Sequence, residues 1–237
     1  MNDSGAAAAY LNQNPLFFMD MREILRRGSG TLLFSNPQGV LLHDTGSGAY
    51  FMSARSEDVL DKMLPGIPER PELLVGHEKW YLDRLKGQFG FERADFCVQS
   101  AWMEETPPDL PDFDGELRFL GPEWAETVYH AYSHAFGGVA YIRGAIERGM
   151  LGLFADGALA GFVGFHDEGA IGMLEVLPPY RRRGYGEVLL RAAVRLAMKQ
   201  KKYPFGQIFD GNTASLALQR KMGMTVSEER LFWLTRE

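Results

Sequence analysis

The chain has 237 residues, of which 46% are hydrophobic and 24% charged, a length that suits one large domain or two ordinary ones. Its formal net charge of -6 disfavours nucleic acid, because a polyanion is repelled. The single cysteine, Cys97, excludes an internal disulfide and a thiolate metal cluster. No segment approaches the roughly 20 apolar residues that span a bilayer. We therefore expect a soluble, cytoplasmic protein of two domains, with no metal and no nucleic-acid or membrane partner.

Residues 1–110 show the pattern of a small α+β domain. Apolar residues recur near helical spacing from Leu16 to Leu25, and the run ends at Gly28. Short apolar runs separated by turn compositions then predict a small antiparallel meander. In order, we expect a helix over 16–27, strands over 31–34, 39–43 and 49–52, helices over 56–64 and 78–86, and a strand over 96–102.

Residues 104–112 combine three prolines with four acids and no periodicity, as expected for an extended connector. We place the domain boundary there, with domains over 1–110 and 111–237. The second domain begins with a strand over 117–120 and helices over 123–132 and 140–148. A hairpin follows, because apolar runs over 152–154 and 159–165 flank Asp156-Gly157, a favoured two-residue turn. A strand, a helix through about residue 200, a strand, a helix and final strands complete it.

The most informative segment runs from Leu174 to Gly186, where an apolar strand leads through a basic loop into an amphipathic helix. A helix N-terminus presents unpaired N–H groups and positive partial charge, and Gly184 and Gly186 let a phosphate approach the backbone. Three consecutive arginines add positive charge: Arg181, Arg182 and Arg183. The pattern is neither a P-loop nor a dinucleotide fingerprint. A plain strand-to-helix turn with solvated arginines is the alternative.

This segment resembles the signature of the GNAT acyl-CoA N-acyltransferases. That signature consists of Arg or Gln, any two residues, Gly, any one residue, and then Gly or Ala. Arg181, Gly184 and Gly186 match it. A second segment, GNTASLALQRKMGM, resembles the family's Asn-x-x-Ser/Ala...Lys-x-Gly pattern. Its matching residues are Asn212, Ser215, Leu218, Lys221 and Gly223. The resemblance covers roughly residues 117–237. Within the superfamily the chain is most similar to two-domain bacterial members and to the FR47-like and glycine N-acyltransferase-like group.

The resemblance implies an α/β fold with a mixed, splayed sheet flanked by helices, and a first half that is a degenerate copy of the same fold. It also implies that acetyl-CoA or another acyl-CoA donates an acyl group to an amine-bearing, small-molecule acceptor. Asn212 equally suits a helix N-cap, and the two roles are compatible. The implied coenzyme A contacts are Leu174, Val176, Arg181, Arg182, Arg183, Gly184, Tyr185, Gly186, Asn212 and Ser215.

Acyl transfer to an amine requires a base, because an ammonium ion has no lone pair for attack. Glu175 is the first candidate, since it is an acid within an apolar strand, and an outward-facing glutamate is the alternative. Glu168 and His166 come second. Many relatives have a tyrosine where this chain has Gln219. Ser215, Tyr180 or water then remain as candidate proton donors to the leaving thiolate, and the remaining alternative is that this step needs no acid.

Direct transfer in a ternary complex, with no covalent enzyme intermediate, is the expected mechanism. Three alternatives stay open: a non-catalytic acyl-CoA-binding module, an interaction protein that holds a partner through its first half, and an O-acyltransferase. The first half is expected to close over the acceptor side or to make a homodimer contact. His134, Tyr132 and Tyr141 fall in the helical pair that covers the acceptor site in the family.

Overall fold

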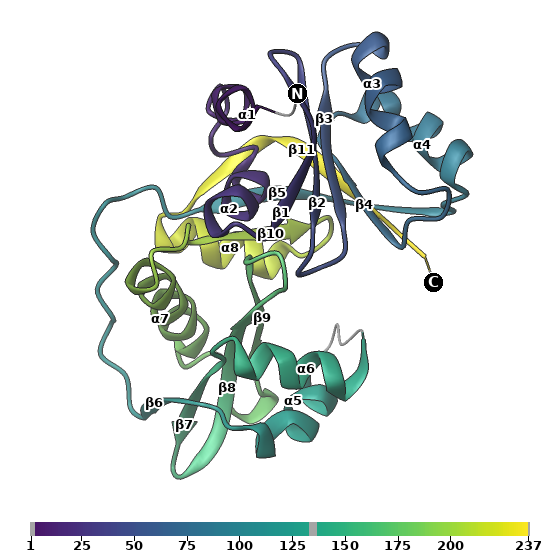
Figure 1. The fold of residues 1–237 in the computed structure, drawn as a ribbon. Helices are drawn as coiled ribbons and strands as arrows, with labels where there is room; N and C mark the ends of the chain where they lie inside the picture. Colours follow the sequence, from purple (N-terminus) through teal and green to yellow (C-terminus); the bar gives the residue numbers. More distant parts are fainter. Residues whose placement is uncertain (1–2, 133–136, 237) are drawn as a thin grey trace. The chain divides into compact units, whose positions relative to one another are not determined.

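The computed structural model describes residues 3–132 and 137–236 (Figure 1). The chain forms two compact units. The first comprises Met1–Ala101, Gln207–Thr213 and Thr225–Glu237, and the second comprises Trp102–Gly206 and Ala214–Met224.

The first unit is built on a seven-stranded sheet with the order β1-β2-β3-β4-β11-β5-β10. Strands β1 to β3 form the predicted antiparallel meander, whereas β3 and β4 run parallel. The elements are α1 (Ser4–Leu11), α2 (Met19–Arg27), β1 (Gly30–Asn36), β2 (Gly39–Asp44), β3 (Tyr50–Ala54), α3 (Glu57–Met63), β4 (Leu73–Gly76), α4 (Leu82–Phe89), β5 (Arg93–Ala101), β10 (Phe205–Phe209) and β11 (Thr225–Thr235).

Alternate residues of this sheet enter two separate cores, as the period of two of a strand requires. Leu41 and Met52 pack with α3 and α4, whereas Leu42 and Phe51 pack with α1 and α2. The sheet therefore carries helices on both faces. Two of these elements have no counterpart in the sequence prediction. Helix α1 consists mainly of small residues without an apolar stripe, and β4 is only four residues long.

The end of the chain lies in the first unit because of the pairing of strand β11. The sequence alone predicts that residues 225–237 belong to the second half. Strand β11 pairs antiparallel with β5 on one side and with β4 on the other. Phe232, for example, faces Phe96 in β5 and Gly76 in β4. Because the paired residues are far apart in the chain, the sequence around residues 225–237 does not indicate their partner strands.

The second unit contains an antiparallel four-stranded sheet with the order β6-β7-β8-β9. Two helices pack on each face: Val163 of β8 lies in the core formed with α7, and the neighbouring Phe162 in the core formed with α5 and α6. The α/β class and the predicted hairpin at Asp156-Gly157 are confirmed. The elements are β6 (Glu116–Phe119), α5 (Ala125–Ala131), α6 (Gly138–Glu147), β7 (Leu151–Ala155), β8 (Ala158–Phe165), β9 (Ile171–Val176), α7 (Tyr185–Lys199) and α8 (Thr213–Met222).

The predicted connector is extended and lies along α7. Arg191 and Arg195 donate hydrogen bonds to the carbonyl oxygens of Asp109 and Pro108, at 3.2 and 3.0 Å. The hydroxyl of Tyr185 donates to the carbonyl of Asp114 at 2.9 Å. The arginine face of α7, which its sequence suggests is solvent-facing, therefore also anchors the connector.

The same order of elements occurs twice along the chain. Two helices, a three-stranded meander, a helix, a strand, a helix and a strand run from α1 to β5, and again from α5 to β11. This repetition agrees with the degenerate copy that the family resemblance implies. The copies differ in strand pairing: β3 pairs with β4, whereas the corresponding β9 and β10 belong to different sheets.

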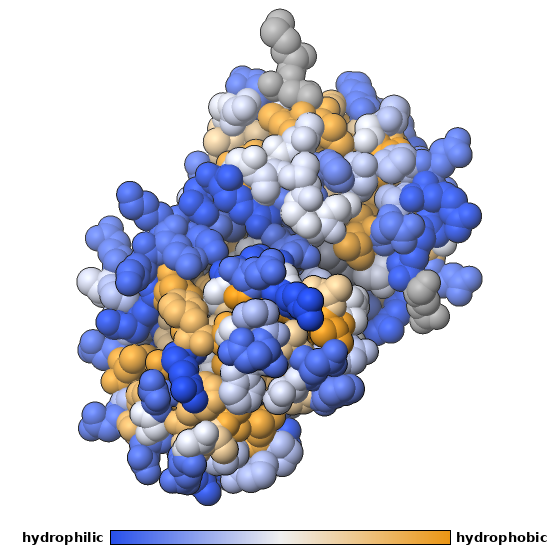
Figure 2. Space-filling model, turned by 60° about the horizontal axis from the view of Figure 1, so that its bottom comes forward, coloured by the Kyte–Doolittle hydropathy of each residue, from blue (hydrophilic) through white to orange (hydrophobic). Residues whose placement is uncertain are grey.

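Side chains of both polarities share the surface. On the face drawn in Figure 2, hydrophobic residues form small patches between hydrophilic ones. Such interspersion is ordinary for a folded chain, because polar groups cannot cover the whole surface. The exposed large hydrophobic residues are Trp80, Met103, Leu110, Phe119 and Phe209.

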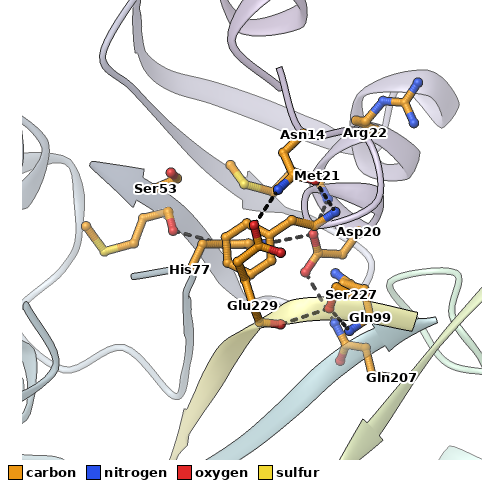
Figure 3. A network of polar contacts seen from close by, with 12 residues as sticks. Asn14, Asp20, Met21, Arg22, Ser53, His77, Gln99, Gln207, Ser227 and Glu229 are labelled. Carbon is orange, nitrogen blue, oxygen red and sulfur yellow. Dashed lines mark hydrogen bonds and ion pairs between the residues drawn. The ribbon is translucent and has the colours of Figure 1, made fainter. Parts of the chain in front are cut away.

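A buried polar network crosses the first unit (Figure 3). His77 Nδ1 lies 3.1 Å from the carbonyl oxygen of Met52, and its Nε2 lies 3.0 Å from Asp20 Oδ1. Gln207 donates to the second carboxylate oxygen of Asp20 at 3.2 Å and accepts from the Trp233 indole at 2.8 Å. A carbonyl and an ionised carboxylate only accept hydrogen bonds, so both ring nitrogens of His77 carry protons when Asp20 is ionised. The geometry therefore describes a buried imidazolium paired with Asp20.

Electrostatics supports this protonation state. Burial lowers the pKa of His77, but the charges of Asp20 and Glu78 and the hydrogen bond to Asp20 outweigh it and shift this pKa above its usual value. A histidine whose pKa is higher in the folded state stabilises the fold at pH values below about 6.5, the pKa of an unfolded histidine. This stabilisation is lost as the pH rises through the folded-state pKa.

We expect the pH dependence of unfolding to reveal His77. As the pH rises above about 6.5, the melting temperature of the wild-type protein should fall relative to that of His77→Gln, which cannot titrate. Thermal unfolding at a series of pH values measures this difference. Parallel curves for the two proteins would contradict a protonated His77 in the fold.

Candidate active site

The loop between β9 and α7 leaves a helix N-terminus uncovered. Gly184 is the N-cap of α7 with φ 82°, a left-handed conformation that favours glycine, and no side chain caps the helix. A Cβ built on Gly184 would meet no atom within 4 Å. A Cβ on Gly186 would lie 3.5 Å from Leu218, an ordinary contact. Space is therefore present in front of the first amides of the helix, which have no intrahelical partner.

The three arginines of this loop are exposed, but they have different surroundings. Arg181 donates to the carbonyl of Val176 at 2.9 Å and to Glu175 Oε1 at 3.2 Å, so its side chain is held against the end of β9. Arg182 has φ 67°, and the guanidinium of Arg183 lies 5.5 Å from the ring centre of Tyr180. Tyr185 is buried in the core, so only its backbone faces the loop.

The second sequence motif lies against the first turn of α7. Lys221 of α8 pairs with Glu187 at 2.7 Å, and this hydrogen bond is the main reason why the pKa of Glu187 lies below its usual value. Gln219 donates to the hydroxyl of Ser215 at 2.9 Å. The fold thus brings the two motifs together within the second unit. Asn212 directly precedes α8, at the predicted N-cap position, and belongs to the first unit.

Strand β9 contains a β-bulge in its middle. Phe162 of β8 faces Glu175, but Gly164 faces Gly172, so two residues of β9 oppose one residue of β8. One of these two is Met173, whose φ of 50° is unusual for a residue with a side chain. Bulges redirect side chains and leave backbone groups unpaired, and they are frequent beside active sites. Nothing in the sequence indicates this one.

The backbone of β9 has a free edge. In the described part of the chain β9 pairs with β8 alone, and β10 is the outer strand of the other sheet. The strands nevertheless approach each other at their beginnings, since a Cβ on Gly206 would lie 2.8 Å from the carbonyl oxygen of Ile171. The predicted contacts Leu174 and Val176 therefore lie on an edge strand.

Tyr132 is directed at the bulge. The backbone of Met173 forms a hydrogen bond with its hydroxyl. Burial raises the pKa of Tyr132 to about 12, and the carboxylates of Glu175 and Glu168 act in the same direction. Both candidate bases therefore lie within electrostatic range of one phenol, although they are distant in sequence from Tyr132.

Polar side chains, most of them half-buried, also surround the loop between β8 and β9. The Tyr141 hydroxyl and His166 Nδ1 form a hydrogen bond of 2.8 Å. Arg148 pairs with Asp167 at 2.5 Å, and Glu168 is buried. Burial, helped by the charge of Arg148, lowers the pKa of His166 to about 4, so this ring is neutral at pH 7. The sequence indicated Tyr141 and His166 separately but not their contact, and His134 lies outside the described residues.

Comparison with known proteins identifies the family. Residues 101–224 match the model of the acetyltransferase (GNAT) family. The chain belongs to the GNAT acetyltransferase family. The resemblance inferred from the two motifs is thereby confirmed.

Solved structures show the same fold across most of the chain. A Drosophila protein with 17% identity has a TM-score of 0.69, with 95% of this chain and 93% of that chain covered. A putative GNAT acetyltransferase from Novosphingobium aromaticivorans has a TM-score of 0.55 at 15% identity, covering 83% and 88%. A tandem GNAT protein from the clavulanic acid biosynthesis pathway has 0.50 at 14% identity, covering 98% and 95%. No curated protein matches this chain.

Two features are absent from the described residues of this GNAT protein. Over 3–132 and 137–236 there is no group of three or more His, Cys, Asp or Glu side chains placed to hold a metal ion. Within the same residues, no helix has the length and apolar character needed to cross a membrane.

The low pKa of His166 predicts acid sensitivity. An unfolded histidine takes up a proton near pH 6.5, whereas folded His166 does so only near pH 4, so protons favour the unfolded state between these values. We expect the melting temperature of the wild-type protein to fall over this interval more steeply than that of His166→Gln. Glutamine accepts the Tyr141 hydrogen bond without titrating. An equally steep decline in both proteins would contradict a neutral, buried His166.

Proposed function

We propose that the second unit transfers an acyl group, most simply acetyl, from coenzyme A to an amine of a small molecule by direct attack in a ternary complex. The observation that carries this proposal is the uncapped N-terminus of α7 behind Gly184, which the basic loop connects to the free edge of β9. Family membership supplies the class of reaction. The acceptor, the acyl donor and the residue roles that follow belong to the proposal.

The loop suits the pyrophosphate of coenzyme A. Unpaired helix amides and positive partial charge attract an anion, and the open space at Gly184 admits one. Arg182 and Arg183 contribute charge near the phosphates, while Arg181 fixes the end of β9 through Glu175 and the Val176 carbonyl. The pantetheine arm carries secondary amides, which match the edge of β9 from Leu174 to Val176, where no second strand pairs with β9 in the described residues and where the Val176 carbonyl already accepts from Arg181.

The chemistry requires removal of a proton from the acceptor. The amine nitrogen attacks the thioester carbonyl carbon, the carbon–sulfur bond breaks, and sulfur leaves with the electron pair as a thiolate. Glu175 receives the proton of the amine in this proposal, because it stands at the bulge with its side chain only 15% exposed. Glu168 is the second candidate for this base. Ser215 is the hydroxyl available on α8 to donate a hydrogen bond to the thiolate.

The first unit lacks the corresponding features. Its strands β3 and β4 are hydrogen-bonded over Tyr50–Leu74, Phe51–Val75 and Met52–Gly76, so the strand equivalent to β9 has no free edge there. The helix after β3 has Glu57 and Asp58 in its first turn, which repel a phosphate. We therefore expect one coenzyme A site per chain.

The substitution Gly184→Asp tests the site. It places a side chain and a negative charge at the proposed pyrophosphate position, and we expect coenzyme A affinity to fall at least about 100-fold, because juxtaposed like charges cost several kcal/mol. Calorimetric titration measures the affinity and, for the wild-type protein, a stoichiometry of one.

Gly157→Asp is the matched control. Gly157 also has a left-handed conformation, φ 79°, and open space around it, but it lies in the β7–β8 turn. Its substitution should have a similar effect on stability and none on coenzyme A binding. Unchanged affinity in folded Gly184→Asp would refute the site assignment.

The substitution Glu175→Gln tests the base. Glutamine keeps an acceptor for Arg181 but cannot take a proton, so kcat should fall about 100-fold or more while KM for acetyl-CoA changes little. Amine-dependent thiol release over a range of pH measures both constants. The control Glu126→Gln removes an exposed carboxylate from α5. A variant with the wild-type rate and pH profile would exclude Glu175 as the base.

A further inference from the structure

The carboxamide of Gln219 is buried, and only one of its two polar atoms has a hydrogen-bond partner in the described residues. Its side chain lies on α8 with 7% of the residue exposed. Nε2 donates to Ser215 Oγ at 2.9 Å, whereas Oε1 is buried and has no hydrogen-bond partner in the described part of the chain. Ser215 therefore holds Nε2 in place, and Oε1 remains a hydrogen-bond acceptor without a donor.

This acceptor faces the place where β9 and β10 begin. Oε1 lies 3.9 Å from the position that a Cβ on Gly206 would occupy. The same Cβ would lie only 2.8 Å from the carbonyl oxygen of Ile171 in β9, so the position requires glycine. Because Gly206 has no side chain, no Cβ there separates Gln219 Oε1 from the start of the two strands, which share no hydrogen-bonded pairing.

A buried acceptor without a donor is costly. Leaving such a group unpaired costs about 1–3 kcal/mol, and an apolar side chain of similar shape avoids that cost. The neighbours of Gln219 on α8 include Leu218 and Met222, which pack into the apolar core of the unit. An amide at this position weakens the free protein, which is explained if a bound molecule supplies the missing donor.

We propose that Gln219 Oε1 accepts a hydrogen bond from an amide N–H of the pantetheine arm of coenzyme A. The inference rests on the proposed function, which places that arm along β9. The arm contains secondary amides, and each N–H needs an acceptor when the arm is enclosed. Backbone groups of β9 serve one side of the arm and the Gln219 carbonyl serves the other. A carboxamide supplies no proton, so Gln219 is a binding residue and not an acid.

The two parts of coenzyme A allow a sharp test. Adenosine 3′,5′-bisphosphate carries the nucleotide without the pantetheine arm, whereas coenzyme A carries both. In Gln219→Met, which keeps the length of the side chain, we expect affinity for coenzyme A to fall about tenfold, since an N–H of the arm is left unpaired. Affinity for adenosine 3′,5′-bisphosphate should equal that of the wild-type protein. Titration calorimetry of both probes measures the difference.

Gln200→Met is the control, because Gln200 is exposed at the end of α7. It should leave both affinities unchanged. Ser215→Ala removes the group that orients the amide and should weaken coenzyme A binding in the same selective way, by a smaller factor. Equal affinity of wild-type and folded Gln219→Met for coenzyme A would overturn the inference. If Gln219→Met does not fold, unchanged affinity in Ser215→Ala overturns it. A folded wild-type protein that binds neither probe would refute the proposed function itself.

Discussion

Strand β9 pairs with a neighbour on one side only, and the candidate site depends on this condition. An unpaired strand edge exposes backbone donors and acceptors and favours unwanted pairing with other chains. Here the edge is short, contains a bulge at Met173, and ends in a basic loop. In the proposed function the same free groups serve a ligand that itself carries amides. The glycines beside this strand have different effects: Gly206 lets the backbone approach its beginning closely, whereas Gly184 leaves space open beyond its end.

The two halves of the chain share one order of elements but differ in whether the third strand of the meander has an unpaired edge. Both follow the same order of helices and strands. In the first half three residue pairs join β3 to β4, and acids occupy the first turn of the next helix. In the second half the corresponding strands lie in different sheets and glycine precedes the helix. The repeated architecture therefore allows a binding site without requiring one.

Each unit also contains a histidine away from bulk solvent, and the two environments shift the histidine pKa in opposite directions. His77 lies between a carbonyl and the carboxylate of Asp20, so the protonated ring is favoured and its pKa is raised. His166 lies against Tyr141 and near the positive charge of Arg148, so its ring is neutral and its pKa is lowered to about 4. Burial alone disfavours the charged form of both, and the neighbouring charge decides the outcome.

The sequence by itself determined the α/β class, most helices, the first meander, the Asp156-Gly157 hairpin and the two motifs that identify the family. These features depend on periodicity and on residues close together in the chain, which local physics specifies. It missed α1, because small residues carry no apolar stripe, and β4, because four residues are too few for a pattern. Only the tertiary structure decided the membership of β11 in the first unit, the bulge at Met173, the Lys221–Glu187 pair and the vacant acceptor of Gln219. Each of these depends on strand pairing or contact between residues distant in sequence, and such pairing is fixed by how the whole core packs rather than by any local signal.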